Sequence, residues 1–221
     1  MEKIKVLILV LSLTDNGGIY DRFKESQLET WDSITVDGVK TFYYYGNSTE
    51  NKIIGNDIHV TTPEDLWNCG IKTIEALKVI NQKFDYDFLY RTNSSSYVDK
   101  EMLIRHLNSA PKNKYYAGHY ANHDGVSYTS GSGIMLSKDL VDLILDKGLS
   151  NTYIDDVDIG KLMNSHGIYT QDILRCHHDY GENFLTCDGI LYRLKTENRE
   201  WDLIQMYQIH KLKLNKYKNY Q

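Results

Sequence analysis

Positive charge is outnumbered by negative charge in this chain of 221 residues. It has 25 lysine and arginine residues against 30 aspartate and glutamate residues, which gives a formal net charge of −5 and a pI near 5.9. Proteins that bind nucleic acid normally carry a basic face, so this balance argues against that class. The only locally basic stretch is KLKLNKYKNYQ, residues 211–221. We expect it to be a solvated helix end, with peripheral contact to an anionic membrane surface as the alternative.

Cysteine is also rare, and long apolar runs are missing. Cys69, Cys176 and Cys187 form an odd set without CxxC spacing, which predicts neither a disulfide framework nor a zinc site and fits a reducing compartment. The N-terminal MEKIKVLILVLSLTDNGG resembles a signal peptide, but no small-x-small cleavage site follows it, and its apolar run is too short to span a bilayer. We therefore expect a cytoplasmic protein without an anchor, whose first buried strand lies at residues 4–13.

Neither internal repeats nor low-complexity tracts occur, which argues against a solenoid or a linker. The length and the hydrophobic content of 41% suit one domain over residues 1–221. Strands are predicted at residues 4–13, 39–47, 86–92, 114–120, 134–136, 170–174 and 189–195, with a further short strand that begins at Asp57 and a glycine-rich turn before residue 134. Helices are predicted at residues 20–31, 63–80, 99–107, 138–147 and 153–168, and from about residue 200. This order predicts an α/β fold with a mostly parallel central sheet and helices on both faces.

Ligands of such sheets bind beyond the carboxyl ends of the strands. This rule places SLTDNGG, residues 12–18, beside RTNSSS, residues 91–96, at the mouth of one site. The second segment is unusual because Asn93, Ser94 and Ser95 follow a core strand where many enzymes keep charged catalytic groups.

Five segments in series resemble the fringe-like and β-1,3-galactosyltransferase group of GT-A glycosyltransferases. YDRFKESQLETW is similar to that family's R-x-x-I-R-x-T-W helix, and PEDLWNCGIKTIEALKVI occurs where the family has D-S-Y-x-N-L-T-x-K-T. FDYDFLYRTNSSSYV resembles the strand that ends in T-D-D-D-V-F-V. YTSGSGIMLSKDL resembles Y-x-x-G-G-G-Y-V-L-S-R-D-L, and IDDVDIGKLMNSHGI resembles E-D-V-x-V-G-x-x-x-x-x-L-G-I. The order agrees over residues 4–170, whereas residues 171–221, which we expect to complete the site, have no clear counterpart.

The resemblance implies a single GT-A-type domain and an inverting glycosyltransferase. Its partners would be a nucleotide-sugar donor, UDP-linked, and a glycan or other hydroxyl acceptor. The chain departs from the family where three aspartates would hold a divalent cation on the donor's diphosphate, because Asn93, Ser94 and Ser95 stand there. Neutral amide and hydroxyl oxygens are poor ligands for Mg²⁺ or Mn²⁺. We therefore predict no essential metal, unless His177 or His178 and further acids replace the missing carboxylates.

Without a metal, cationic side chains would have to neutralise the departing diphosphate. Arg193 and Lys195 are two residues apart, so they share one face if this segment is a strand, and the resemblance to some metal-independent GT-A enzymes implies this role. The alternative is an ordinary exposed strand face. His177 and His178 would point to opposite faces, so at most one of them enters the site. That histidine would donate a hydrogen bond to a phosphate group or be the remnant of a former metal site. A loop histidine satisfied by water is the alternative.

A base must take the proton of the acceptor hydroxyl. Asp155 and Asp156 follow a loop at a predicted helix N-terminus, where the helix dipole favours a carboxylate and like charges raise one pKa. The resemblance assigns the base to the second acid of the pair, Asp156. Two helix-capping acids are the alternative. Asp158 is predicted to face solvent.

The remaining site candidates concern the nucleotide and the sugar. Thr14 and Asp15 follow the first strand and would meet the uracil ring, and Arg22 would reach a phosphate or else pair with Glu25 or Glu29. Asn93 and Ser95 would hydrogen-bond the ribose or the donor sugar.

Gly131 and Gly133 would let backbone approach a sugar closely, although a structural turn also needs glycine. A chain with this fold but without the three aspartates also fits a second function, that of a carbohydrate- or nucleotide-binding module without catalysis.

Overall fold

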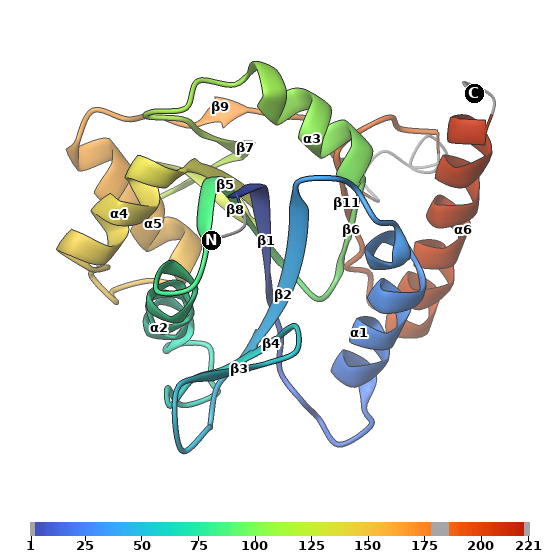
Figure 1. The fold of residues 1–221 in the computed structure, drawn as a ribbon, viewed down its shortest axis with the longest axis horizontal. Coiled ribbons are helices and arrows are strands. Elements are labelled where there is room, and N and C mark those ends of the chain that lie inside the picture. Colours follow the sequence, from blue (N-terminus) through green and yellow to red (C-terminus); the bar gives the residue numbers. More distant parts are fainter. Residues whose placement is uncertain (1–2, 178–185, 219–221) are drawn as a thin grey trace.

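The structure is a computed structural model that describes residues 3–177 and 186–218. One large sheet forms its centre (Figure 1). Its strands are β1 (Lys3–Leu11), β2 (Val39–Tyr45), β3 (Lys52–Ile54), β4 (Asp57–His59), β5 (Asp85–Asn93), β7 (Tyr116–His123), β8 (Val126–Ser137) and β9 (Gln171–Asp172). They lie in the order β3-β4-β2-β1-β5-β8-β7-β9. The central strands β4, β2, β1 and β5 are parallel, and β8 runs antiparallel to both β5 and β7. The prediction of a mostly parallel sheet is confirmed.

Helices cover both faces of this sheet, as predicted (Figure 1). They are α1 (Ile19–Glu29), α2 (Cys69–Asn81), α3 (Lys100–Ser109), α4 (Lys138–Lys147), α5 (Asp155–Ser165) and α6 (Arg199–Lys218), with a 3-10 turn at Trp31–Ser33. Apolar side chains of α1, α3 and α6 share one core cluster, and those of α2, α4 and α5 share another.

The first strand is apolar on both sides because both of its faces are buried. Val6, Ile8 and Val10 of β1 belong to the first cluster, whereas Leu7 and Leu9 belong to the second. All five side chains have no exposed surface. The predicted first buried strand at residues 4–13 is therefore confirmed, and its lack of polar alternation follows from burial on two sides.

A second, smaller sheet joins the C-terminal segment to the middle of the chain. Its strands are β10 (Arg175–His177), β11 (Leu191–Arg193) and β6 (Ser96–Val98), in the order β10-β11-β6. The strand β6 follows β5 after the two-residue turn at Ser94 and Ser95. Arg193 is the register partner of Ser96, and the Leu194 amide donates to the Ser95 carbonyl at 2.9 Å. The segment without a family counterpart thus lies directly against the Asn-Ser-Ser position.

Two predicted boundaries are wrong. The second helix begins at Cys69 and not near Pro63, because the acids of that segment have other partners. Glu64 binds the buried ammonium of Lys72 and accepts the Gly46 amide at 2.6 Å, and Asp65 accepts the Asn68 amide at 2.9 Å.

The strand predicted at residues 134–136 begins earlier, at Val126, after a turn that lies between the two strands as predicted. The turn between β7 and β8 is at Asp124 and Gly125, which have positive φ angles of 49° and 80°. Gly131 and Gly133 lie inside β8.

A disulfide joins Cys176 to Cys187, whose Cα atoms are 5.8 Å apart, so the prediction of unpaired cysteines is wrong. Cys69 is free. The pairing depends on the fold, because the parallel pairing of β10 and β11 brings the two segments together. The cysteine pattern consequently gives no support to a reducing compartment.

Replacing Cys187 by serine is expected to lower the free energy of unfolding by about 2–3 kcal/mol, since the bridge closes a loop of 11 residues in the unfolded chain. Urea unfolding with and without reductant measures this. Reductant should destabilise the natural chain but not the variant. Cys69→Ser is the matched control and should change stability by less than about 1 kcal/mol. A natural chain that is equally stable in reductant would contradict the prediction.

Two lysines of the basic C-terminal stretch bind acids of their own chain. Lys213 is only 5% exposed and contacts Asp99 at 2.8 Å and Asp188 at 2.9 Å. Lys216 also pairs with Asp188. The expected solvated helix end is therefore wrong for Lys213, and both side chains stabilise the docking of α6. In the described ranges, no helix has the length and apolar character needed to cross a membrane.

Candidate functional site

The two predicted loops meet at the carboxyl edge of the sheet. Leu11, the last residue of β1, is the register partner of Asn93, the last residue of β5. Residues 12–18 and 94–96 therefore leave the sheet side by side, as predicted. The N-terminus of α5 joins them there through β8.

Asp155 and Asp156 begin α5 and are both buried, with exposed fractions of 4% and 8%. The Asp156 carboxylate accepts the Gly131 amide at 2.7 Å and the Val157 amide at 2.9 Å. Burial raises the pKa of Asp156, and the charge of Asp155 raises it further, although these two amides oppose the shift. The N-cap of α5 is Ile154, so neither acid occupies that position.

Arg91 of β5 is a site residue that the sequence analysis missed. Its side chain is 2% exposed, and its guanidinium lies 2.5 Å from the Asp155 carboxylate and donates to the Gly131 carbonyl. Burial opposes the charged form, but Asp155, Tyr44 and Asp156 outweigh it and raise the pKa of Arg91. The signal was an arginine inside the apolar strand DFLYRT, because a buried charge requires a partner.

The Asp155 carboxylate forms both an ion pair and a hydrogen bond. Besides the ion pair with Arg91, it accepts the Thr73 hydroxyl at 3.3 Å, and that hydroxyl contacts the Tyr44 hydroxyl at 2.8 Å. Asp156, in contrast, has no ion pair among the residues that the structure describes. The two neighbouring acids therefore have different environments: one is neutralised by a cation, and the other is held by backbone amides.

Arg193 is half-buried at the end of β11, whereas Lys195 is exposed beyond it. Burial lowers the pKa of Arg193 to about 10, and the charges of Arg175, Arg199 and Arg91 contribute, while Asp156 opposes the shift. The Nη1 atom of Arg193 is buried without a hydrogen-bond partner in the described part of the chain. Of the predicted pair, Arg193 is therefore the one with a buried, unpartnered nitrogen in the described part of the chain.

His177 is the register partner of Arg193, and its ring centroid lies 6.0 Å from that of His119 on β7. His178 lies outside the described residues. Arg175, which the sequence analysis did not single out, donates to the hydroxyls of Ser130 and Ser132 at 3.0 and 3.4 Å.

Asn93, Ser94 and Ser95 form a closed polar turn. The Asn93 side-chain oxygen accepts the Ser95 hydroxyl at 3.2 Å and the Ser96 hydroxyl at 3.0 Å. Its amide nitrogen donates to the Gly131 carbonyl at 3.4 Å. Ser94 and Ser95 are each 7% exposed. These groups consequently bond mainly to one another and to β8.

Two of the three nucleotide candidates after β1 have other partners. Thr14 is exposed. The Asp15 carboxylate accepts the Tyr20 and Asp21 amides at 3.0 and 3.1 Å and so caps the first turn of α1. Arg22 pairs with Glu200 of α6 at 2.6 Å, and not with either acid of its own helix.

The glycines of β8 are required by close packing. A Cβ atom on Gly131 would lie 2.8 Å from Nη1 of Arg91 and 3.0 Å from Oδ2 of Asp156. A Cβ atom on Gly133 would collide with the Tyr90 hydroxyl. Gly131 therefore lets β8 approach both charged groups of the site.

The prediction that Asp158 faces solvent is wrong. Its side chain is 1% exposed, accepts the Ser150 hydroxyl at 2.5 Å and accepts the Thr152 amide at 3.1 Å. Asp158 thus fixes the loop that leads into α5, because its carboxylate satisfies polar groups of residues 150–153.

Comparison with known proteins identifies the fold. No family model and no curated protein matches the sequence. A solved glycosyltransferase involved in the glycosylation of the major capsid of PBCV-1 matches with a TM-score of 0.53 and 14% identity, over 92% of this chain and 98% of that one. The apo-form glycosyltransferase GlyE of Streptococcus pneumoniae TIGR4 matches with a TM-score of 0.54 and 10% identity, over 99% of this chain and 64% of that one. The chain has a GT-A-type glycosyltransferase fold. The fringe-like subtype remains a prediction.

The position at which the family resemblance predicts a divalent cation contains no carboxylate. Asn93, Ser94 and Ser95 supply neutral oxygens, whereas Mg²⁺ and Mn²⁺ favour carboxylates. Of the two acids that begin α5, Asp155 is paired with Arg91, and Asp156 binds two amides. Within residues 3–177 and 186–218, no group of three or more histidine, cysteine or acidic side chains is arranged to hold a metal ion.

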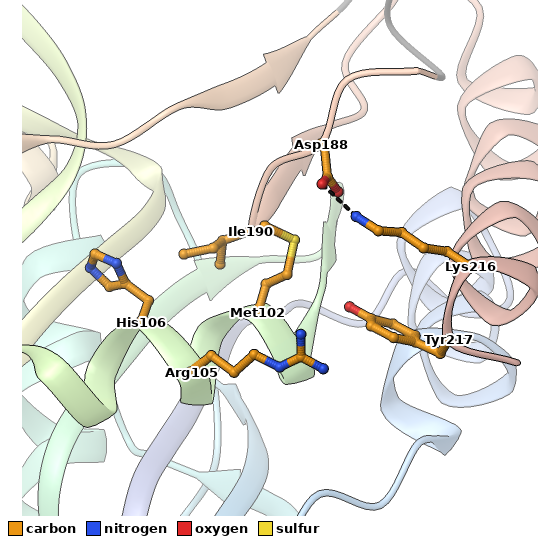
Figure 2. A pocket seen from close by; sticks show the side chains of 7 residues that line it. All are labelled: Met102, Arg105, His106, Asp188, Ile190, Lys216 and Tyr217. Carbon is orange, nitrogen blue, oxygen red and sulfur yellow. Dashed lines mark hydrogen bonds and ion pairs between the residues drawn. The ribbon is translucent and has the colours of Figure 1, made fainter. Parts of the chain in front are cut away.

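One cavity of about 520 Å³ lies away from these residues, between α3 and α6 (Figure 2). It is lined by Met102, Arg105, His106, Asp188, Ile190, Lys216 and Tyr217. In Figure 2 the Lys216 ammonium points to the Asp188 carboxylate across one side of the cavity. None of the predicted site residues lines it, so we do not include it in the GT-A site.

Proposed function

We propose that this chain is an inverting glycosyltransferase. It moves a sugar from a UDP-linked nucleotide-sugar to the hydroxyl of a glycan or other acceptor and requires no divalent cation. One observation carries this proposal: Asp155 is neutralised by Arg91, whereas Asp156 beside it has no cationic partner among the described residues and a raised pKa. Such a division between two neighbouring carboxyls is typical of a pair in which one member acts as acid or base.

In the proposed reaction Asp156 is the base. It accepts the proton of the acceptor hydroxyl while that oxygen bonds to the anomeric carbon. The bond from this carbon to the donor's diphosphate breaks on the opposite side, so the configuration inverts. Arg193 stabilises the negative charge that develops on the leaving diphosphate, because the Nη1 group of this half-buried side chain has no hydrogen-bond partner among the described residues.

The Asn-Ser-Ser turn takes a neutral role in this proposal. Asn93 and Ser95 hydrogen-bond the ribose or the donor sugar, and Gly131 allows the backbone of β8 to lie close to that sugar. The uracil ring lies against residues 13–15 at the end of β1. Support for this position comes from the pairing of β1 with β5, which sets both loops at one edge.

A second function, binding of a nucleotide or carbohydrate without catalysis, is favoured by the two amide contacts of Asp156. Both oxygens of Asp156 accept backbone amides, which stabilise its ionised form and weaken it as a base. Measured turnover distinguishes this function from the first.

The test is incubation of chelator-treated protein with a panel of UDP-sugars and simple glycan acceptors, with and without Mn²⁺. Released UDP is assayed, and the anomeric configuration of the product is read by NMR. We expect one UDP-sugar to be consumed at equal rates in chelator and in Mn²⁺, with inversion. GDP-linked and CMP-linked sugars are the control donors. Binding of a donor without any turnover would establish the second function, and strict dependence on Mn²⁺ or retention of configuration would overturn the mechanism.

A further inference from the structure

Two large apolar side chains are exposed on the turn that precedes α2. Leu66 has 61% of its surface exposed and Trp67 has 68%. The turn is held by its own hydrogen bonds, because the Asp65 carboxylate accepts the Asn68 backbone amide at 2.9 Å and the Asn68 side-chain amide at 2.6 Å. The chain thus presents an indole to solvent although burial of such a side chain is favourable.

On one side this turn is joined to the loop after β1. The Glu64 carboxylate pairs with the ammonium of Lys72, a buried residue in the first turn of α2. The same ammonium donates to the Ser12 carbonyl at 2.7 Å. Residues 12–18 belong to the proposed site, so the turn before α2 is anchored beside it.

On the other side the start of α2 packs against the segment that leads into α5. A Cβ atom on Gly70 would lie 3.8 Å from Oδ1 of Asn151 and 3.9 Å from Cβ of Asp155. Gly70 follows Trp67 by three residues, and three residues of chain span at most about 11 Å. Trp67 is therefore close both to the loop after β1 and to the acid pair that contains the proposed base.

The groups around Trp67 favour a neutral sugar as its ligand. Asp65 has no ion pair among the described residues, and the Asn68 side chain lowers the pKa of Asp65 by donating a hydrogen bond. This ionised carboxylate repels phosphate groups and anionic lipids. An aromatic face stacks on the C–H face of a pyranose ring, while amide groups such as those of Asn68 and Asn151 hydrogen-bond its hydroxyls.

A protein partner fits this surface less well. Besides Leu66 and Trp67, the exposed apolar side chains nearest in the chain to Gly70 and Asp155 are Ile71 and Ile154. A stable protein interface contains about 20–30 residues on each side, which is many more than this patch offers.

We propose that Trp67 is the platform on which a sugar residue of the acceptor stacks. The inference rests on the proposed function in one respect, namely that the bound sugar is the acceptor of transfer. Leu66 extends the apolar surface beside the indole. The acceptor is a neutral glycan, since an anionic one meets the carboxylate of Asp65.

Acrylamide quenching of tryptophan fluorescence tests this platform without turnover. Of the three tryptophans, Trp31 is fully buried, so Trp67 is the exposed one in the full chain with Trp201→Phe. In the presence of UDP, we expect lactose, cellobiose or N-acetyllactosamine to lower the quenching of Trp67 about twofold or more, because a stacked ring covers the indole. Sialyllactose, which is anionic, should protect it less than lactose does.

The matched control moves the exposed indole to a distant position. Tyr169 is 66% exposed and lies beyond the C-terminus of α5, a helix of 11 residues and therefore about 16 Å long. The variant with Trp67→Phe, Trp201→Phe and Tyr169→Trp should show no protection by these sugars. Equal protection in this variant would overturn the inference, as would no protection of Trp67 by any neutral sugar. Stronger protection by sialyllactose than by lactose would overturn the neutral class.

Kinetics give a second test. Trp67→Ala should raise the KM for the acceptor about tenfold or more and leave the KM for the UDP-sugar within about twofold, because stacking contributes to acceptor binding alone. Trp67→Phe keeps an aromatic face and should recover most of the affinity. Tyr169→Ala is the control and should change neither constant more than about twofold. Equal loss in Trp67→Phe and Trp67→Ala, or an equal rise of both constants, would contradict a stacking role.

The proposed function can fail separately. Protection of Trp67 by a disaccharide, without turnover of any UDP-sugar, would leave the platform intact and refute glycosyl transfer. Transfer with an unchanged acceptor KM in Trp67→Ala would refute the platform and leave the transfer standing.

Discussion

Asp156→Asn is expected to reduce sugar transfer about 10²- to 10⁴-fold, because the amide cannot take the proton of the acceptor hydroxyl. Donor binding should persist, since the variant leaves Arg193 in place. The rate of UDP release in the presence of acceptor measures the effect, and calorimetry with the donor measures binding. A variant that keeps more than about a tenth of the transfer rate would remove Asp156 from the role of base.

Burial of Asp156 also determines how the stability of this variant, relative to the natural chain, depends on pH. The pKa of Asp156 is raised above its ordinary 3.8, first by burial and then by the charge of Asp155, so the native chain retains this proton to a higher pH than the unfolded chain does. The stability that follows from the raised pKa is complete below the unfolded pKa and is lost as the pH rises through the folded one. The free energy of unfolding of Asp156→Asn, relative to the natural chain, should therefore increase with pH above 3.8.

The stability contributed by Asp156 decreases as the pH rises, whereas sugar transfer by the natural chain should increase, because the base acts only when ionised. Its rate is expected to fall as the pH drops through the raised pKa of Asp156. Asp158→Asn is the matched control: it lies on the same helix and is also buried, but it binds the loop of residues 150–153. That variant should lose stability and retain transfer for each folded molecule.

Arg91→Met is expected to lower the free energy of unfolding by about 3–5 kcal/mol, because it leaves Asp155 buried without its cation. Transfer should also fall, since Arg91 holds the Gly131 carbonyl and the Gly131 amide holds Asp156. Urea unfolding and UDP release measure the two effects. Arg105→Met, a matched change at a largely exposed arginine, should alter stability by less than about 0.5 kcal/mol.

The double variant Arg91→Met with Asp155→Leu distinguishes the destabilisation caused by an unpaired buried charge from the effect of losing the arginine's contact with Gly131. Buried ion pairs can be replaced by apolar residues at little loss of stability, so the double variant should regain much of what Arg91→Met loses. Transfer should not return, because Gly131 still lacks its partner. Additive losses in the double variant would contradict the assigned ion pair.

Particular residues show how far sequence reasoning reached. The apolar strand at residues 4–13 and the acid pair Asp155 and Asp156 could be located because burial and chain order dictate both. The contact between residues 12–18 and 91–96 followed from the rule that parallel strands end at the same edge. Asp158 was misjudged because helix periodicity does not reveal that a preceding loop folds back over a carboxylate.

The partners of two arginines and of two cysteines could not be predicted from the sequence, and the reason is the same for each. Arg91, Arg175 and the disulfide of Cys176 with Cys187 each involve residues that are distant in sequence and meet only through strand register. The apolar strand around Arg91 indicates that this arginine needs a partner but not which one, and Arg175 lies in a segment without a distinctive pattern. Neither spacing nor composition encodes such contacts.

The sequence by itself determined the α/β order, the apolar central strand and the position of neutral Asn93, Ser94 and Ser95 after β5, because periodicity and local chemistry act over a few residues. Only the tertiary structure decided that Arg91 neutralises Asp155 and that backbone amides hold Asp156. Those choices depend on the register of β8, since ion pairs form between side chains that packing brings within a few ångströms.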